Sequence, residues 1–148
     1  MMFKAFNNFA DFSGRASRSE YWLFFLLNMI VFGMAAAFML SGIASLSDVE
    51  DLRRHIHNTS FAIGLFVAVV WLVFAIIPSI AVTVRRLHDR NMSGWWYLGF
   101  TVLGAVPLVG WIASLAFLVV VCLRGTRGEN RFGEDPLDDG WGSADVFA

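Results

Sequence analysis

Residues 85–96 read RRLHDRNMSGWW and connect two long apolar segments of the chain. Three arginines, a histidine and an aspartate lie within residues 85–90, directly after one apolar run and shortly before the next. Charge is packed this tightly between two membrane-length runs nowhere else in the sequence. We therefore expect this stretch to mark the ends of two membrane helices and to be the functional centre, although it names neither a reaction nor a ligand.

The composition indicates a membrane protein. Apolar residues make up 57 % of the 148 residues and charged residues 16 %, whereas a soluble domain carries about 25 % charged residues. Residues 22–46, 61–84 and 95–123 contain no Asp, Glu, Lys, Arg or His. Each run exceeds the ~20 residues that a helix needs to cross a hydrocarbon core of ~30 Å. The sequence therefore predicts an all-α integral membrane bundle.

We expect one membrane domain over residues 1–136, followed by a flexible acidic tail at 137–148. Its lead, residues 1–20, is predicted to lie on the membrane surface as an amphipathic helix, because Phe3, Phe6, Phe9 and Phe12 recur every three positions. Spanning helices are expected over residues 20–46 and 61–84. Ser17 and Glu20 have the spacing of a capping box, which places the start of the first spanning helix at residues 17–19.

The third apolar run is interrupted by Pro107 and Gly110. We predict two short helices over residues 95–106 and 108–123 with a turn between them, and the alternative is a third spanning helix. Lysine and arginine favour the cytoplasmic side. A turn places nine of the eleven Lys and Arg residues on one side of the membrane, whereas a third crossing divides them six to five. The turn is preferred, with both termini cytoplasmic.

Small, polar and kinking residues within the spans suggest how the helices pack. A stripe of small side chains at every fourth position predicts a packing seam within the chain, with a homodimer contact as the alternative: Gly33, Ala37, Ser41 and Ser45. Asn28 is expected to form an interhelical hydrogen bond. Pro78 leaves the carbonyl of Phe74 without its helical donor and predicts a kink that redirects Arg85.

Three segments read FSGRASRSEYW at residues 12–22, RRLHDRNMSGWW at 85–96 and GTRGENRFGEDP at 125–136. Together they resemble a bacterial inner-membrane family catalogued as domain of unknown function 805. The resemblance covers about residues 3 to 136. It implies a small polytopic protein of the bacterial plasma membrane, with no established activity and no catalytic residues to carry over.

With the turn at Pro107, these three motifs would meet at one membrane face. The candidates for a ligand site or a structural network are Arg15, Arg18, Glu20, Arg85, Arg86, His88, Asp89, Arg90, Asn130 and Arg131. The main hypothesis is a structural or interaction protein in which buried ion pairs fix the helix ends. The alternative is a protein that binds an anionic lipid or another phosphate-bearing ligand, because guanidinium groups match phosphate oxygens.

Two further functions have less support in the sequence. A transporter or channel subunit would need ionisable groups inside the membrane, and the apolar runs hold none. An enzyme using His88 as general acid or base would need Asp89 or Glu20 to orient it. We expect no catalytic residue, no cofactor and no metal ion, the pair His55 and His57 being too weak a metal signal. The expected partners are membrane lipids, anionic ones included, and a second copy or another membrane protein, with no nucleic acid.

Overall fold

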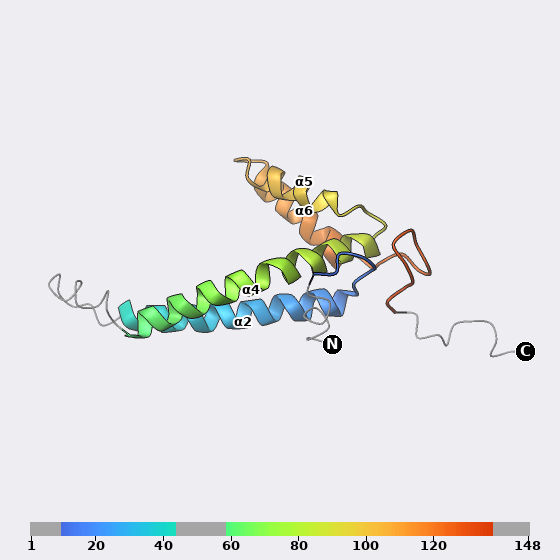
Figure 1. Ribbon diagram of the computed structural model, residues 1–148. Coiled ribbons are helices and arrows are strands. Elements are labelled where there is room, and N and C mark those ends of the chain that lie inside the picture. The colour runs from blue at the N-terminus through green and yellow to red at the C-terminus, as the bar shows by residue number, and fades with distance from the viewer. Residues whose placement is uncertain (1–9, 44–58, 138–148) are drawn as a thin grey trace, which may run out of the picture. The chain divides into compact units, whose positions relative to one another are not determined.

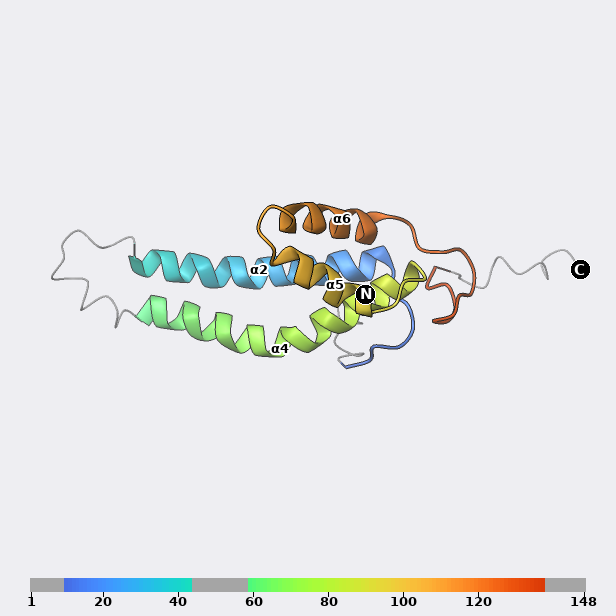
Figure 2. The ribbon, with the colours of Figure 1, turned by 90° about the horizontal axis from the view of Figure 1, so that it is seen from above.

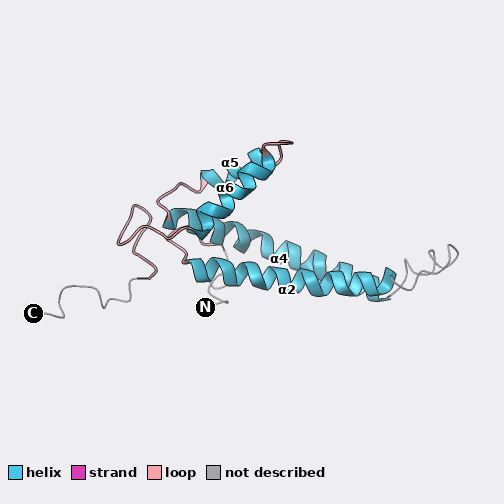
Figure 3. Cartoon of the chain, turned by 180° about the vertical axis from the view of Figure 1, so that it is seen from behind, coloured by secondary structure: helices cyan, strands magenta, loops and turns pink. Residues whose placement is uncertain are grey.

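The computed structural model describes residues 10–43 and 59–137. These residues form four α-helices: α2 (Arg18–Ile43), α4 (Thr59–Asp89), α5 (Trp95–Gly104) and α6 (Gly110–Cys122) (Figure 1). The described ranges contain no β-strand (Figure 3). By length and composition, two helical segments are able to cross a membrane, Arg18–Ser41 and Thr59–Asp89. The predicted all-α membrane architecture is therefore confirmed.

The chain divides into two compact units. Unit 2 is Phe24–Ile77, and unit 1 contains the chain up to Leu23 and from Pro78 onward. The long helices α2 and α4 each contribute to both units. Pro78 lies inside α4, which continues through it, so the kink expected at this proline stays a prediction.

In unit 2, α2 and α4 run antiparallel (Figures 1 and 2). A Cβ atom on Gly64 would lie 2.6 Å from the carbonyl oxygen of Ala35 and 2.9 Å from the amide nitrogen of Met39. Trp71 Nε1 donates a hydrogen bond of 3.1 Å to Asn28 Oδ1. The interhelical hydrogen bond predicted for Asn28 is thus confirmed, and a glycine allows the two backbones to approach closely.

The predicted packing stripe is wrong as a seam within the chain. Gly33, Ala37 and Ser41 are exposed, whereas Ala35 between them is buried. A Cβ atom on Gly33 would meet nothing within 4 Å. The physical reason is that α4 offers its own small residue, Gly64, to the other face of α2. Ser45 lies outside the described residues, and the alternative role of the stripe in a homodimer stays a prediction.

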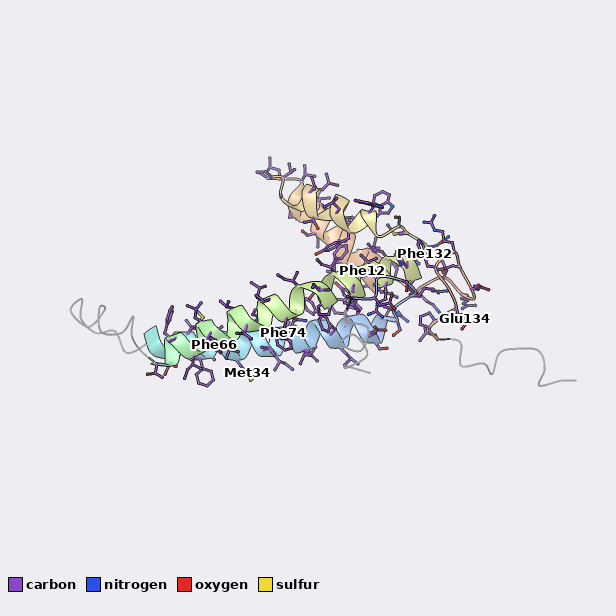
Figure 4. All side chains as sticks on the ribbon, viewed as in Figure 1. Phe12, Met34, Phe66, Phe74, Phe132 and Glu134 are labelled. Atoms are coloured by element: carbon purple, nitrogen blue, oxygen red, sulfur yellow. The ribbon has the colours of Figure 1, made fainter. Side chains whose placement is uncertain are left out.

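The remaining apolar surface of these helices faces outward. Met34, Phe66 and Phe74 project from the helix pair with 53 %, 69 % and 60 % of their surface exposed (Figure 4). A soluble protein rarely exposes large apolar side chains along a whole helix. Such side chains are expected where lipid tails are the solvent.

In unit 1, a turn and a cap set the start of α2. Ser13 donates two hydrogen bonds to the Asp11 carboxylate, from its hydroxyl and from its amide, and Gly14 has a left-handed φ of 74°. These bonds, helped by the charge of Arg85, hold the pKa of Asp11 below its ordinary value. Ser17 Oγ then accepts the amide of Glu20 at 3.2 Å, so α2 begins where the capping pattern placed it.

Residues 10–17 form no helix. The amphipathic surface helix predicted over the lead is therefore wrong at residues 10–12, because local bonds from Ser13 to Asp11 compete with a helical backbone. Residues 1–9 and the predicted flexible tail at 138–148 lie outside the described part of the chain, as do His55 and His57.

Helix α4 extends beyond the predicted end at residue 84 and stops at Asp89. Asn91 adopts a left-handed φ of 58°, its amide donates to the His88 carbonyl, and the Met92 amide donates to the Leu87 carbonyl. This pair of bonds is a Schellman cap, with asparagine in the place that glycine more often occupies. The first charged residues of the motif are consequently helical.

Helices α5 and α6 form a short antiparallel pair (Figure 2). The chain reverses over residues 105–109, and a Cβ atom on Gly110 would lie 2.2 Å from the Gly104 carbonyl oxygen, so this contact requires glycine. The Phe117 ring packs against the rings of Tyr97 and Phe100, with centroids 6.4 and 5.4 Å apart. The turn predicted from Pro107 and Gly110 is confirmed, and the helices begin and end within a few residues of the predicted limits.

Candidate functional site

Three segments that are distant in the sequence meet at the C-terminal end of α4, all within unit 1. The Ala16 amide donates to the Arg85 carbonyl at 3.1 Å, and the Thr126 amide donates to the Asp89 carbonyl at 2.8 Å. Asn130 Nδ2 donates to the His88 carbonyl at 3.0 Å. The last carbonyls of a helix have no partner within the helix. Here the segment after α6 supplies donors for the His88 and Asp89 carbonyls, and the amino-terminal segment adds a bond to the Arg85 carbonyl one turn earlier.

Asp89 is the centre of this meeting point. It is only 3 % exposed. Its Oδ1 atom accepts hydrogen bonds from Arg15 Nε at 3.0 Å and from Arg15 Nη2 at 2.9 Å, and its Oδ2 atom accepts one from Arg86 Nη1. A buried carboxylate is stable only when it is paired and hydrogen-bonded. Two arginines from different segments fulfil both conditions here. We call Arg15, Arg86 and Asp89 the arginine clasp.

Arg15 uses all of its hydrogen-bonding capacity inside the protein. Besides the two bonds to Asp89, Nη2 donates to the Thr126 carbonyl, and Nη1 donates to the carbonyls of Gly128 and Gly133. A guanidinium group has five N–H donors, and these five bonds engage each of them. Gly128 and Gly133 have φ angles of 71° and 127°, which glycine adopts at low cost. The segment is thereby folded around the guanidinium.

Arg86 acts as a cap for a different helix. It is 1 % exposed, its Nε donates to the Val121 carbonyl at 3.0 Å, and its Nη2 donates to the Leu123 carbonyl at the end of α6. Its Nη1 also donates to the Ala16 carbonyl at 3.3 Å. Helix α6 has no basic residue in its own last turn. The positive charge of Arg86 therefore complements the negative end of the α6 dipole from outside the helix.

Arg85 is buried as deeply but bonded far less. It is 2 % exposed, and its Nη1 lies 2.9 Å from Glu20 Oε1. Its Nε and Nη2 atoms, and Glu20 Oε1 itself, have no hydrogen-bond partner in the described part of the chain. The contact is thus an ion pair by distance without the geometry of a hydrogen bond. A buried charged donor without an acceptor is costly, so this pair contrasts sharply with the arginine clasp.

The His88 side chain makes one hydrogen bond and one ring-stacking contact. Its Nδ1 atom lies 3.2 Å from the Gly14 carbonyl oxygen, and its ring stacks on Phe132 with centroids 3.9 Å apart. Because a carbonyl can only accept, Nδ1 carries the proton in this contact. Among the described residues, neither Asp89 nor Glu20 hydrogen-bonds to His88. The acid or base pair considered in the sequence does not form in this arrangement.

Three of the other candidate residues make hydrogen bonds near the end of α4, and the fourth is exposed. Asn130 Nδ2 also bonds to Thr126 Oγ1 at 2.8 Å, and its Oδ1 accepts the Phe132 amide at 2.9 Å. Arg90 Nη1 donates to the Arg124 carbonyl. Arg131 donates to the Asn91 carbonyl at 2.9 Å and lies over the Phe132 ring. Arg18 is exposed at the start of α2.

The sequence did not identify three residues that the clasp needs. A Cβ atom on Gly125 would lie 2.0 Å from Asp89 Oδ2. Thr126 bonds to Asp89 through its amide and, at 3.2 Å, through its hydroxyl. Asp135 Oδ1 lies 3.8 Å from Arg15 Nη2. Their only signal was their place in the third motif, since a spacing of almost forty residues from Asp89 gives no local pattern.

A groove between α5 and α6 also lies in unit 1. It is lined by Tyr97, Phe100, Thr101, Gly104, Ser114 and Phe117. The hydroxyls of Thr101 and Ser114 donate within their own helices, to the Tyr97 and Gly110 carbonyls, each at 2.8 Å. No charged residue is among the lining residues. The groove therefore offers shape and aromatic surface.

Comparisons with known proteins identify the family of this chain and several of its relatives. Residues 9–134 match the family model described as protein of unknown function (DUF805). Two Escherichia coli K12 relatives are inner membrane protein YhaI, 35 % identical over 87 % of this chain and 88 % of the relative, and inner membrane protein YhaH, 36 % identical over 90 % and 93 %. The uncharacterized protein YiiR is 29 % identical over 86 % and 87 %. No solved structure matches.

Proposed function

Since this chain belongs to the DUF805 family of proteins of unknown function, we propose its role from its own residues: it is a structural or interaction protein of the inner membrane and not an enzyme. Its relatives are inner membrane proteins, and two of its helices are long enough to span. The arginine clasp locks the end of α4, the amino-terminal segment and the segment after α6 into one unit.

The observation that carries the proposal is that every side-chain nitrogen of both clasp arginines donates inside the protein. Every N–H group of Arg15 donates to Asp89 or to a backbone carbonyl. Arg86 makes four bonds of the same kind. Donors that are already engaged are not available to a substrate. Their chemistry fixes chain segments, as expected for a buried network with satisfied partners.

The transporter alternative has less support than the structural one. Asn28 is the strongly polar residue of the first span, and its Oδ1 is engaged by Trp71 while its Nδ2 donates to the Phe24 carbonyl at 2.8 Å. Among the described residues of unit 2, the helices carry no Asp, Glu, Lys or Arg. Ion-coupled transporters place ionisable groups inside the membrane.

Limited digestion by trypsin in detergent micelles tests the structural role. Asp89→Asn removes the shared carboxylate, so residues 125–137 should detach from α4, and cleavage after Arg124, Arg127 and Arg131 should become about tenfold faster. The control is Glu129→Gln, which makes the same chemical change at an exposed position of that segment and should be digested like the wild type. Equal digestion of Asp89→Asn and the wild type would refute the proposal.

We propose further that the protein is multi-pass with both termini in the cytoplasm. Support comes from the turn between α5 and α6, which returns the chain to the end of α4, where Arg90 bonds to the Arg124 carbonyl. The basic residues of the three motifs then share the side that positive charge favours. Reporter fusions at residues 52 and 148 should report opposite sides of the membrane. The same side for both would support three crossings instead.

A further inference from the structure

We propose that the amino-terminal end of α2, together with Arg85, is a binding site for a phosphate-bearing anion. This site lies beside the arginine clasp, and the inference goes beyond the structural role proposed above. Its centre is the one deeply buried arginine of unit 1 whose side chain has no hydrogen bond in the described part of the chain. Arg85 and Arg86 are neighbours in sequence but differ in this respect.

The first observation concerns the donors at the start of α2. The first amides of a helix have no partner within it. Ser17 Oγ accepts the Glu20 amide, and the Tyr21 amide donates to the Ser17 carbonyl. The amides of Arg18 and Ser19 donate no hydrogen bond within the described residues, and both residues are exposed. They are the donors that a helix start presents to an anion, and the positive end of the helix dipole adds to the attraction.

The second observation is that Arg85 lies against the first turn of α2. Its Nη1 atom lies 2.9 Å from Oε1 of Glu20, which is the third residue of α2. Its carbonyl accepts the amide of Ala16, which directly precedes the cap Ser17. The Arg85 atoms Nε and Nη2 remain without acceptors although they are buried. Nε and an adjacent Nη form the fork of donors that matches two phosphate oxygens.

The charges around the site determine what it would bind. Arg18, on the exposed side of the helix start, and Arg85 are positive, whereas Glu20 and Asp11 are the acids close to Arg85. Glu20 therefore competes with an incoming anion for the same guanidinium. A phosphate group carries more acceptor oxygens than a carboxylate and can satisfy the fork and the helix amides together. Two sources supply such a group: the headgroup of an anionic lipid, and a phosphate compound in solution.

The first experiment measures bound lipid. The full-length protein is reconstituted into vesicles of equal parts phosphatidylethanolamine and phosphatidylglycerol, extracted gently, and analysed by native mass spectrometry. We expect retained phosphatidylglycerol on the wild type, and about tenfold less on Arg85→Gln, the loss expected for about two charge-assisted hydrogen bonds partly offset by solvent. Arg127→Gln is the matched control, because it removes the same charge at an exposed position, and it should retain the lipid.

The second experiment tests the soluble source. The protein is placed in bilayer discs of phosphatidylethanolamine alone, and inorganic phosphate or pyrophosphate is titrated while thermal unfolding is followed. Stabilisation of the wild type and of Arg127→Gln, with none in Arg85→Gln, assigns the site to a phosphate compound in solution. If Arg85→Gln changes neither lipid retention nor stabilisation by phosphate, the proposal is wrong.

Two more variants separate binding from folding. Arg85→Lys keeps the charge beside Glu20 but removes the fork of donors, so it should fold and still bind several-fold less anion. Glu20→Gln removes the competing carboxylate and should retain more lipid, or bind phosphate more tightly, than the wild type. A purely structural Arg85–Glu20 pair predicts the opposite, namely a less stable protein with no gain in binding. The trypsin test of the clasp is independent, because it concerns Asp89 and not Arg85.

Discussion

Asp89 accepts two hydrogen bonds from the guanidinium of Arg15 on a single carboxylate oxygen, at 3.0 and 2.9 Å, although 74 residues separate them in the chain. Asp89 is the last residue of α4, where the helix dipole is negative and a carboxylate is unfavourable. Arg15 and Arg86 offset that cost with two positive charges. The acid is therefore stable only while the amino-terminal segment is docked, which ties the end of α4 to the start of the chain.

Replacing Arg15 by lysine tests how much the guanidinium shape contributes. Lysine retains the charge but has a single nitrogen, which cannot reach Asp89 and the carbonyls of Gly128 and Gly133 together. We expect Arg15→Lys to lower the free energy of unfolding by about 3 kcal/mol, from the loss of several hydrogen bonds to charged groups. Denaturant unfolding in micelles, followed by tryptophan fluorescence, measures it. The exposed Arg127→Lys should stay within about 0.5 kcal/mol of the wild type; a similar value for Arg15→Lys would contradict the clasp.

Gly125 is predicted to be intolerant of any side chain. A Cβ atom there would lie 2.0 Å from Asp89 Oδ2, so the segment after α6 would have to move off the clasp. Gly125→Ala should cost about 1–3 kcal/mol by overpacking and should speed tryptic cleavage after Arg127. Gly99→Ala is the control, since Gly99 lies in α5 with open space around its Cα and alanine favours a helix by up to about 1 kcal/mol. Equal stability of the two variants would refute the contact.

Much of the fold could be predicted because its signals are local or additive. The uncharged runs gave the long helices, Ser17 gave the start of α2, and counting charges gave the turn at Pro107. The capping signal of Asn91, by contrast, was not recognised, so the predicted end of α4 fell before Arg85.

The site could be predicted only as a set of residues and not as a set of contacts. The sequence named Arg15, Arg86 and Asp89, but a pairing over 74 residues leaves no trace in spacing. Most partners of the two arginines are backbone carbonyls, which every residue carries and which no motif displays. Arg86 donates from all three of its side-chain nitrogens, whereas Nε and Nη2 of Arg85 have no acceptor in the described part of the chain. This difference is visible only in three dimensions.

The contact between α2 and α4 at Gly64 gives a further prediction. A Cβ atom on Gly64 would press within 2.6 Å of the Ala35 carbonyl oxygen, whereas one on Gly33 would meet nothing within 4 Å. Gly64→Ala should separate α2 from α4 in unit 2 and destabilise the protein by about 1–3 kcal/mol. Gly33→Ala should not destabilise the monomer and should favour the helix by up to about 1 kcal/mol, as at Gly99. If Gly33→Ala instead lowers stability in a way that depends on protein concentration, the stripe of Gly33, Ala37 and Ser41 is a contact between copies.

The hydrogen bond between Trp71 and Asn28 can be measured by a double-mutant cycle. Asn28→Leu and Trp71→Phe each remove one partner of the 3.1 Å bond. Interhelical hydrogen bonds in membranes contribute about 0.6 kcal/mol on average and up to about 1.7 kcal/mol, so the two losses should be non-additive by an amount in this range. Reversible unfolding in mixed micelles gives the four free energies that the cycle needs.

A second cycle provides the control for this pair. Trp111 in α6 is 66 % exposed and belongs to unit 1, whereas Asn28 belongs to unit 2. Asn28→Leu combined with Trp111→Phe should therefore be additive within about 0.5 kcal/mol, as expected for independent sites. Additivity in the first cycle as well would mean that Asn28 contributes through its bond to the Phe24 carbonyl in its own helix and not through α4. Asn28 would then bend or cap α2 locally. The close contact at Gly64 would be the feature that aligns α2 with α4 in unit 2.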